Sequence, residues 1–167
     1  RPLLPHVIFS GYFDDPEATR RAFHGDWYGS GDLGVKDAEG DFYFVDRKKD
    51  YIRYKGRNIS SLQVESVAAS HPAVAAAAVY GVPSETLESE HEIKLDAILR
   101  PGHSLSCEEL ARHINEHAPY FCVPRYIEFV SELPYTPTQK LEKYKLRAKG
   151  ISAATWDRLT SDFELQR

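Results

Sequence analysis

The sequence predicts an α+β fold: a three-stranded sheet with helices packed on it, plus a β-hairpin, all preceded by a β-rich segment. Three observations support this prediction. Extended segments are short and bounded by glycine or proline, helical segments begin at capping residues, and from residue 60 the order is α-β-β-α-β-α. The chain has 167 residues, of which 42% are hydrophobic, so it is long enough to bury a core.

The first part of the chain predicts one helix followed by a pair of strands. The sequence Asp-Asp-Pro-Glu at 14–17 supplies a capping residue, a proline in the first turn and an early acid, so a helix is expected from here to about Phe23. Strands are expected at 33–35 and 42–45, joined by a turn at 37–40. This part is therefore expected to be rich in β-structure.

The charged segment 46–50 is the expected domain boundary. It divides the chain into a β-rich piece at 1–46 and a second domain at 47–167. The chain contains no methionine and opens in what reads as the middle of a strand, so we expect it to be a fragment of a longer protein.

A hairpin and a helix open the second domain. Strands at 51–54 and 57–59 are separated by a Lys-Gly pair that favours a tight turn. Ser60 and Gln63 then form the S-x-x-Q pattern of a capping box, which predicts a helix to about Ser70.

Three segments predict the strands of the sheet. The nearly continuous apolar run 74–82 favours a central strand covered on both faces. The segment 92–99 alternates, with apolar residues on one side and Lys94 and Asp96 on the other, so it is expected to have one better-buried face. A third strand is expected at 126–130.

Helices are expected between and after these strands. Ser106 and Glu109 form a second capping box, which predicts a helix to about His117. Two further short helices are expected at 143–149 and 155–163.

Composition argues against several classes of partner. The net charge is −4 and the isoelectric point is about 6.0, which gives no case for nucleic acid or an anionic membrane. No apolar stretch approaches the length of a membrane span. The two cysteines, Cys107 and Cys122, lack C-x-x-C spacing, so reduced thiols and a cytoplasmic location are expected.

Several familiar motifs fail at a required position. Tyr28 stands two residues before Ser30, where the G-x-S-x-G hydrolase motif needs a glycine. His113 and His117 are four residues apart but have no third ligand at a suitable spacing, and Leu95 replaces the second histidine of H-E-x-x-H. The sequence has no G-x-x-x-x-G-K-[ST] loop. We therefore expect no metal site here, and only part of any nucleotide site.

The segment 27–60 is the strongest candidate for ligand binding. It holds five glycines, six acidic residues and seven lysines or arginines. A carboxylate such as Asp32 can accept hydrogen bonds from both hydroxyls of a ribose, while phosphates bind fixed cations and backbone N–H groups at glycines. The alternative, on composition alone, is a solvated and charged β-meander.

Lys140 is a second candidate, because it follows the proline-containing segment 134–139 and does not lie on a helix face. The prolines restrict that loop, so its lysine can present one compact charge to a phosphate or a carboxylate. The alternative is an ordinary solvated lysine.

Four segments together resemble one family. They are GSGDLG (29–34), DRKKDYIRYKGRNIS (46–60), HPAVAAAAVYGVP (71–83) and LPYTPTQKLEKYKLR (133–147). In this order they resemble the C-terminal part of the adenylate-forming enzymes, which include AMP-dependent acyl-CoA synthetases, firefly luciferases and peptide-synthetase adenylation domains. The stretch YFCVPRYIEFVSELPYTPTQKLEKYKLR is most similar to crotonobetaine/carnitine-CoA ligase-like members.

The resemblance implies an enzyme that acts in two steps. ATP and a carboxylic acid form an acyl-adenylate, and the acyl group then passes to a thiol, usually that of coenzyme A. The resemblance implies that Asp32 binds the ribose of ATP or AMP, that Arg47 assists there, and that Lys140 bridges the acid's carboxylate and the α-phosphate region. Mg²⁺ is expected to take part, with its ligand upstream of this chain.

The resemblance also implies that the second domain is a mobile lid on a large N-terminal adenylation domain, of which 1–46 is the last piece. Lys49 matches the position of the hinge. In the arrangement that forms the thioester, the hairpin that carries Arg53, Lys55 and Gly56 would face the thiol, and Gly56 would allow close approach of the pantetheine.

Three positions depart from the family pattern. Ser30 stands where the family usually has threonine, and Asn58 stands where many members have arginine. Gln139 replaces the glycine that normally precedes the lysine, which is expected to stiffen the loop.

The leading hypothesis is therefore the C-terminal part of an ATP-dependent carboxylic acid–CoA ligase, inactive on its own. One alternative is a non-catalytic interaction or nucleotide-sensing module that keeps the lid fold. Another is an adenylation partner of a phosphopantetheine carrier protein. The acid that is activated is not predicted.

Overall fold

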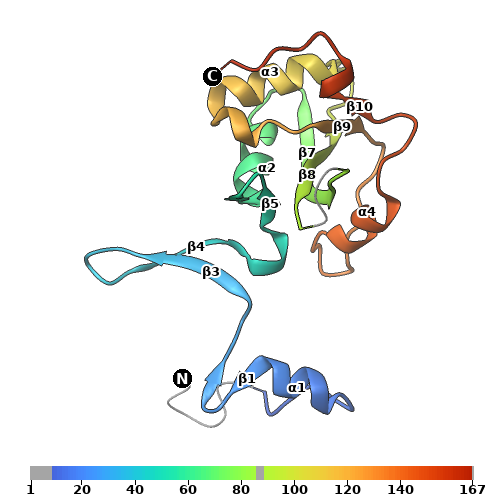
Figure 1. Cartoon of the computed structure of the whole chain (residues 1–167). Helices are drawn as coiled ribbons and strands as arrows, with labels where there is room; N and C mark the ends of the chain where they lie inside the picture. Colours follow the sequence, from blue (N-terminus) through green and yellow to red (C-terminus); the bar gives the residue numbers. More distant parts are fainter. Residues whose placement is uncertain (1–8, 86–88, 167) are drawn as a thin grey trace. The chain divides into compact units, whose positions relative to one another are not determined.

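The computed structural model describes residues 9–85 and 89–166 (Figure 1). The chain forms two compact units, residues 1–49 and 50–167. The division falls within the charged segment 46–50. The assignment of the first unit to a larger preceding domain stays a prediction.

The described part of the first unit, residues 9–49, contains one helix and two antiparallel strand pairs. Its elements are α1 (Pro16–Ala22), β1 (Phe23–His24), β2 (Trp27–Tyr28), β3 (Asp32–Lys36) and β4 (Phe42–Arg47). The Asp15 carboxylate caps α1 by accepting a hydrogen bond of 2.8 Å from the Ala18 N–H. The helix and the longer strand pair lie where the sequence predicts them.

The β3–β4 pair contains a close approach of two backbones. A Cβ atom on Gly34 would lie 2.9 Å from the carbonyl oxygen of Tyr43, so this position requires glycine. The turn between the strands is closed by the Asp37 carboxylate, which accepts hydrogen bonds of 2.8 Å from the N–H groups of Gly40 and Asp41.

The second unit is built on a four-stranded sheet in the order β10-β9-β8-β7. Its strands are β7 (Val74–Pro83), β8 (His91–Leu99), β9 (Tyr126–Phe129) and β10 (Trp156–Asp157). Strand β8 runs antiparallel to β7 and parallel to β9, and β10 pairs antiparallel with β9. The unit also contains a separate hairpin and three α-helices: β5 (Ile52–Tyr54), β6 (Arg57–Ile59), α2 (Ser61–Ala69), α3 (Cys107–His117) and α4 (Lys143–Lys149).

Both predicted capping sites begin a helix. The Ser60 hydroxyl accepts a hydrogen bond from the Gln63 N–H at the start of α2. Ser106 and Glu109 form a complete capping box at the start of α3, in which each side chain accepts from the other residue's N–H. The mixed α+β class and the order of elements from α2 to α4 are thereby confirmed.

The sheet corrects three details of the prediction. Strand β7 is covered on both faces, but it lies at the edge of the sheet, because β8 pairs with both β7 and β9. Residues 155–163 do not form a helix: strand β10 pairs with β9 and extends the three predicted strands to four, and a short 3-10 helix (Arg158–Thr160) follows it. The polar face of β8 is also buried, since Lys94 and Asp96 are both fully enclosed.

Apolar side chains pack in two clusters, one on each side of the sheet. The larger cluster joins the sheet to α2, α3 and the β5–β6 hairpin. The smaller cluster joins β7 and β9 to α4, through residues such as Tyr80, Tyr126 and Leu146. Figure 1 shows α2 and α4 on opposite sides of β7. This two-sided burial explains why β7 is an unbroken apolar run although it is an edge strand.

Candidate functional site

Lys140 lies at the end of a tight loop that its own backbone closes. Tyr135 and Leu141 form an isolated antiparallel bridge, and the Thr136 N–H donates a 2.8 Å hydrogen bond to the Lys140 carbonyl oxygen. The Thr136 hydroxyl in turn accepts a 3.0 Å hydrogen bond from the Lys140 N–H. Lys140 is exposed, and its ammonium group has no hydrogen bond or ion pair within residues 9–85 and 89–166. The backbone is therefore held while the charge is available to a ligand.

Gln139, which precedes this lysine, has a backbone φ of +62°. This is the left-handed region that glycine adopts without strain, whereas a residue with a side chain pays a steric penalty there. The conformation shows why glycine suits this position, and the Gln139 N–H bond of 2.9 Å to the Thr136 carbonyl oxygen helps to hold it.

Asp32 and Arg47 lie opposite each other at the ends of β3 and β4 in the first unit. The Arg47 Nε atom is 2.8 Å from Asp32 Oδ1, and the two side chains are 52% and 37% exposed. The Asp32 N–H donates a 3.2 Å hydrogen bond to the Ser30 hydroxyl. The pair places an accepting carboxylate and a donating guanidinium side by side in an accessible position, which suits a ligand with hydroxyl groups.

The turn of the β5–β6 hairpin is held by a carboxylate that the sequence analysis missed. Lys55 and Gly56 have φ values of +46° and +76°, as a tight hairpin turn requires. Their N–H groups donate hydrogen bonds of 3.0 and 2.8 Å to the two oxygens of Glu90. In the strands below, Arg53 donates a 3.1 Å hydrogen bond to the Asn58 side chain. Glu90 lies far along the chain in an acidic segment, so no local pattern points to it.

Lys49 lies in a short 3-10 helix, Lys48–Asp50, at the junction of the two units. The next residue, Asp50, belongs to the second unit and pairs with Arg147 on α4 at 2.7 Å. The family resemblance implies that Lys49 is the hinge, called the pivot below. No local pattern predicted that α4 would bind the neighbouring carboxylate of Asp50.

A cluster of buried charges lies on the α4 side of the sheet, and the sequence analysis missed it too. The fully buried Lys94 ammonium donates hydrogen bonds to Glu128 at 2.8 Å and to the Gly150 carbonyl oxygen at 2.7 Å, and it lies 3.3 Å from Asp96. The Asp96 carboxylate also accepts a 2.8 Å hydrogen bond from the Tyr80 hydroxyl. Alternation within β8 indicated a polar face, but nothing local showed that α4 covers that face.

The two carboxylates of this cluster have opposite pKa shifts. Burial raises the pKa of Asp96. Burial would raise that of Glu128 as well, but hydrogen bonds from Lys149, Lys94 and Thr155 outweigh it and lower the pKa to about 2. Glu128 is therefore ionised at neutral pH and balances the buried charge of Lys94.

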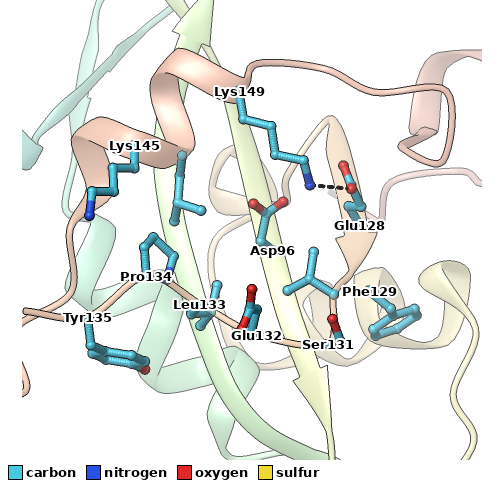
Figure 2. A pocket seen from close by; sticks show the side chains of 12 residues that line it. Asp96, Glu128, Phe129, Ser131, Glu132, Leu133, Pro134, Tyr135, Lys145 and Lys149 are labelled. Carbon is cyan, nitrogen blue, oxygen red and sulfur yellow. Dashed lines mark hydrogen bonds and ion pairs between the residues drawn. The ribbon is translucent and has the colours of Figure 1, made fainter.

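A hollow of about 750 Å³ is lined by residues of α4, β8, β9 and the segment leading toward Lys140. Figure 2 shows the side chains that line it. Lys149 extends from α4 to Glu128, with 2.8 Å between ammonium and carboxylate, and Lys145 is paired with Glu142. Both cations beside the hollow are thus engaged, and Lys140 does not line it.

Within the described ranges, no group of three or more histidine, cysteine, aspartate or glutamate side chains could hold a metal ion. His113, one of the two histidines considered in the sequence, instead contacts the Ser70 hydroxyl at 2.9 Å. The described helices are all too short or too polar to cross a membrane.

Comparison with known proteins identifies the second unit. Residues 63–140 match the model of the AMP-binding enzyme C-terminal domain family. The chain is 39% identical over 155 residues to the rat (Rattus norvegicus) mitochondrial acyl-coenzyme A synthetase ACSM2. The aligned region covers 89% of this chain and 27% of that protein. The chain is 36% identical over 142 residues to an Escherichia coli crotonobetaine/carnitine–CoA ligase, with coverage of 84% and 27%. The chain thus spans about a quarter of the length of these curated relatives.

Solved structures agree with this assignment. The amide bond synthetase McbA from Marinactinospora thermotolerans superposes with a TM-score of 0.73 and 36% identity, covering 84% of this chain and 28% of that one. The anthranilate CoA ligase AuaEII in complex with anthranoyl-AMP superposes with a TM-score of 0.75 and 34% identity, covering 84% and 27%. The match to the family model, the relatives and these structures all lead to the same conclusion. Residues 63–140 carry the AMP-binding enzyme C-terminal domain, and along most of its length the chain resembles adenylate-forming enzymes such as acyl-CoA synthetases.

Proposed function

We propose that this chain is the C-terminal part of an ATP-dependent carboxylic acid–CoA ligase, which forms an acyl-adenylate and then a thioester. The observation that carries the proposal is the state of Lys140: an exposed ammonium, without a partner among the described residues, on a loop closed by backbone hydrogen bonds. A loop lysine that only kept the chain soluble would not need such a rigid support. The printed names of the relatives, which include CoA ligases and synthetases, favour the same reaction class.

In the adenylation step, the carboxylate of the acid attacks the α-phosphate of ATP and pyrophosphate leaves. Two anions must approach each other, so a cation between them stabilises the developing charge. We assign this role to the Lys140 ammonium. Asp32 and Arg47 would bind the ribose of the same nucleotide, since they present an acceptor and a donor 2.8 Å apart. Mg²⁺ would offset phosphate charge when bound, and we expect its ligands outside this chain.

In the second step, the thiol of coenzyme A displaces AMP from the acyl-adenylate. We assign the β5–β6 hairpin to the surface that faces the thiol, with Arg53 and Lys55 as its charged residues. We assign Lys49 as the pivot about which the second unit rotates between the adenylation and the thioester-forming arrangements. Gly56 suits a close approach, because a Cβ atom built on it would meet no other atom within 4 Å. A carrier-protein phosphopantetheine would present the same thiol, so the acceptor is a question for experiment.

The proposal makes the chain dependent on a large adenylation domain, which would supply the acid pocket and the remaining nucleotide contacts. We therefore expect the isolated 167 residues to show negligible acid-dependent exchange of pyrophosphate into ATP. Robust exchange by the isolated chain would contradict the proposal that a separate adenylation domain supplies the acid pocket and the remaining nucleotide contacts. A cytoplasmic location is part of the proposal and not a finding, and the rat relative is named as mitochondrial.

The test uses the full-length protein and measures the two steps separately. ATP–pyrophosphate exchange is assayed with butyrate, hexanoate, benzoate and anthranilate, and thioester formation is assayed from preformed acyl-adenylate and coenzyme A. Lys140→Ala should lower exchange by about 10²–10³-fold, as expected for loss of a group that stabilises transition-state charge, and should change thioester formation by less than about threefold. Lys145→Ala is the matched control, because this lysine is exposed but paired with Glu142.

Two outcomes would contradict the proposal. Equal loss of both steps in Lys140→Ala would remove the assigned role of the lysine. Absence of exchange with all four acids in the unmodified protein would favour the non-catalytic lid module.

A further inference from the structure

Helix α4, which follows the Lys140 loop directly, is attached to four other parts of the second unit by contacts of charged side chains. Along its length Lys143 pairs with Glu65 of α2, Arg147 pairs with Asp50 beside the pivot, Lys149 pairs with Glu128 of β9, and Lys94 of β8 binds the carbonyl oxygen of Gly150 at its end. The separations of these pairs are all 2.7 or 2.8 Å. These contacts hold α4 against the sheet and α2.

The contact between Arg147 and Asp50 differs from the others in what it connects. Asp50 is the residue immediately after Lys49, and its carboxylate oxygen lies 2.7 Å from the Arg147 guanidinium. The two side chains are 13% and 32% exposed, so the pair is largely withdrawn from solvent. It links the first residue of the second unit to the helix that starts three residues after Lys140.

The β5–β6 hairpin is connected to the pivot through the chain itself and not through a tertiary contact. Strand β5 begins at Ile52, only two residues after Asp50, so its position relative to Lys49 is set by the covalent chain. Lys140 is remote from Lys49 in sequence. Its position relative to the pivot therefore depends on tertiary contacts, and one of these, the pair between Arg147 and Asp50, ends at the residue beside the pivot.

We propose that the Arg147–Asp50 ion pair makes the Lys140 loop follow rotation about Lys49, so that both residues act as positioning residues for adenylation. This inference rests on the proposed function. An error of about 1 Å in placing a catalytic group can cost a large factor in rate, so a moderate loosening of this link is enough to affect the step that uses Lys140. Thioester formation, the step that uses the β5–β6 hairpin, should be little affected, because the hairpin follows the pivot directly in the chain.

The test compares two variants of α4 in the full-length protein. Arg147→Met removes the 2.7 Å pair with Asp50. Lys143→Met removes the more buried 2.8 Å pair with Glu65 and a 2.7 Å hydrogen bond to the Ser61 hydroxyl, neither of which involves the pivot. The acid is the one of the four above that supports the fastest exchange. Arg147→Met should lower the kcat of exchange by about tenfold and leave thioester formation from preformed acyl-adenylate within about threefold. Lys143→Met should change the two steps by the same factor.

Further variants separate positioning from loss of folding. Asp50→Asn should reproduce the selective loss, Arg147→Lys should restore part of the exchange rate, and the double variant Asp50→Arg with Arg147→Asp should restore more than either single change. The midpoint of thermal unfolding is measured for each variant. Positioning is supported if Arg147→Met selectively slows exchange while its midpoint is no lower than that of Lys143→Met.

Three results distinguish the possible failures. If Arg147→Met and Lys143→Met give the same ratio of the two steps, the inference is wrong and the proposed function stands. If Arg147→Met impairs the thioester step more than exchange, the assignment of the pair to adenylation is wrong. If the unmodified protein shows no exchange, the proposed function itself fails.

Discussion

Residues 9–49 and residues 50–166 differ in what they bury. Every buried hydrophobic residue that the structure describes lies in the second unit, and all of them except Ala73 belong to the two clusters on the two sides of its sheet. In the described part of the first unit the single buried residue is Asp46, while Phe42, Tyr43 and Phe44 are each more than half exposed. One unit has a core of its own, and the other presents its apolar side chains to the surroundings.

This contrast shows which parts of the chain can stand alone. Two-stranded hairpins are marginally stable in water unless a hydrophobic face is covered. Phe42 is 79% exposed and its neighbours on β4 project to both sides of the hairpin, so neither face is covered within this unit. The exposure favours the proposal that a larger adenylation domain packs against these strands.

The largest expected effect comes from the buried charge of the second unit. Lys94→Met removes the buried cation between two enclosed carboxylates, so that Asp96 keeps only the Tyr80 hydroxyl and Glu128 keeps Lys149 as its cation. We expect a loss of about 3–5 kcal/mol in the free energy of unfolding, measured by urea denaturation of the 167-residue chain. Lys149→Met, at the exposed edge of the same cluster, is the control and should cost much less. Comparable losses for the two variants would show that burial does not set the cost.

A slightly smaller effect is expected from the apolar core. Leu95 is fully buried in the larger cluster, so Leu95→Ala should cost about 2–5 kcal/mol through lost transfer energy and the cavity it leaves. The free energy of unfolding is again read from urea denaturation. A loss below about 1 kcal/mol would mean that the sheet repacks easily and that the contrast with the first unit is overstated.

The next effect depends on pH. The pKa of Glu128 is about 2 in the folded chain, compared with an ordinary value of 4.5. A carboxyl group with a lowered folded pKa stabilises the fold above its unfolded pKa, and this contribution is lost as the pH falls through the range from 4.5 toward 2. The stability difference between the unmodified chain and Glu128→Gln should therefore shrink as the pH falls from about 6 to about 2.

Asp96 has the opposite sign, and the comparison with Glu128→Gln removes it from the measurement. Its raised pKa means that the folded state binds a proton more readily, so its protonation favours folding as the pH falls. Because Asp96 is present in both proteins, its effect largely cancels in their difference. A stability difference that stays constant over this pH range would contradict the lowered pKa of Glu128.

The smallest effect is expected in the first unit. Phe44 is 58% exposed, so Phe44→Ser should change the free energy of unfolding of the 167-residue chain by no more than about 0.5 kcal/mol. In the full-length protein the same change should cost clearly more, since a covering domain would bury this ring. Equal and small losses in both would argue against such a domain packing on β4.

Local signals predicted most of the helices and strands, whereas the roles of Asp32, Arg47 and Lys140 came from the family resemblance and stay predictions. Capping residues at Asp15, Ser60 and Ser106 mark the helix starts because they satisfy N–H groups within a few residues, which is a local interaction. Residues 155–163 could not be predicted in this way, because their backbone is engaged by β9, which is distant in sequence. The same limit hid Glu90, whose carboxylate binds the Lys55 and Gly56 N–H groups.

The sequence by itself predicted the resemblance to adenylate-forming enzymes and the α+β class, because motif order and hydrophobic periodicity are properties of the linear chain. Through that resemblance it also named Asp32, Arg47, Lys49 and Lys140 as candidates, and their roles stay predictions. Only the tertiary structure decided which charged side chains contact each other. It placed Asp32 against Arg47, enclosed Lys94 beneath α4 and joined Asp50 to Arg147. Pairs between residues far apart in the chain depend on how sheets and helices pack, and the chemistry of a charged side chain is set by the partner and the burial that this packing provides.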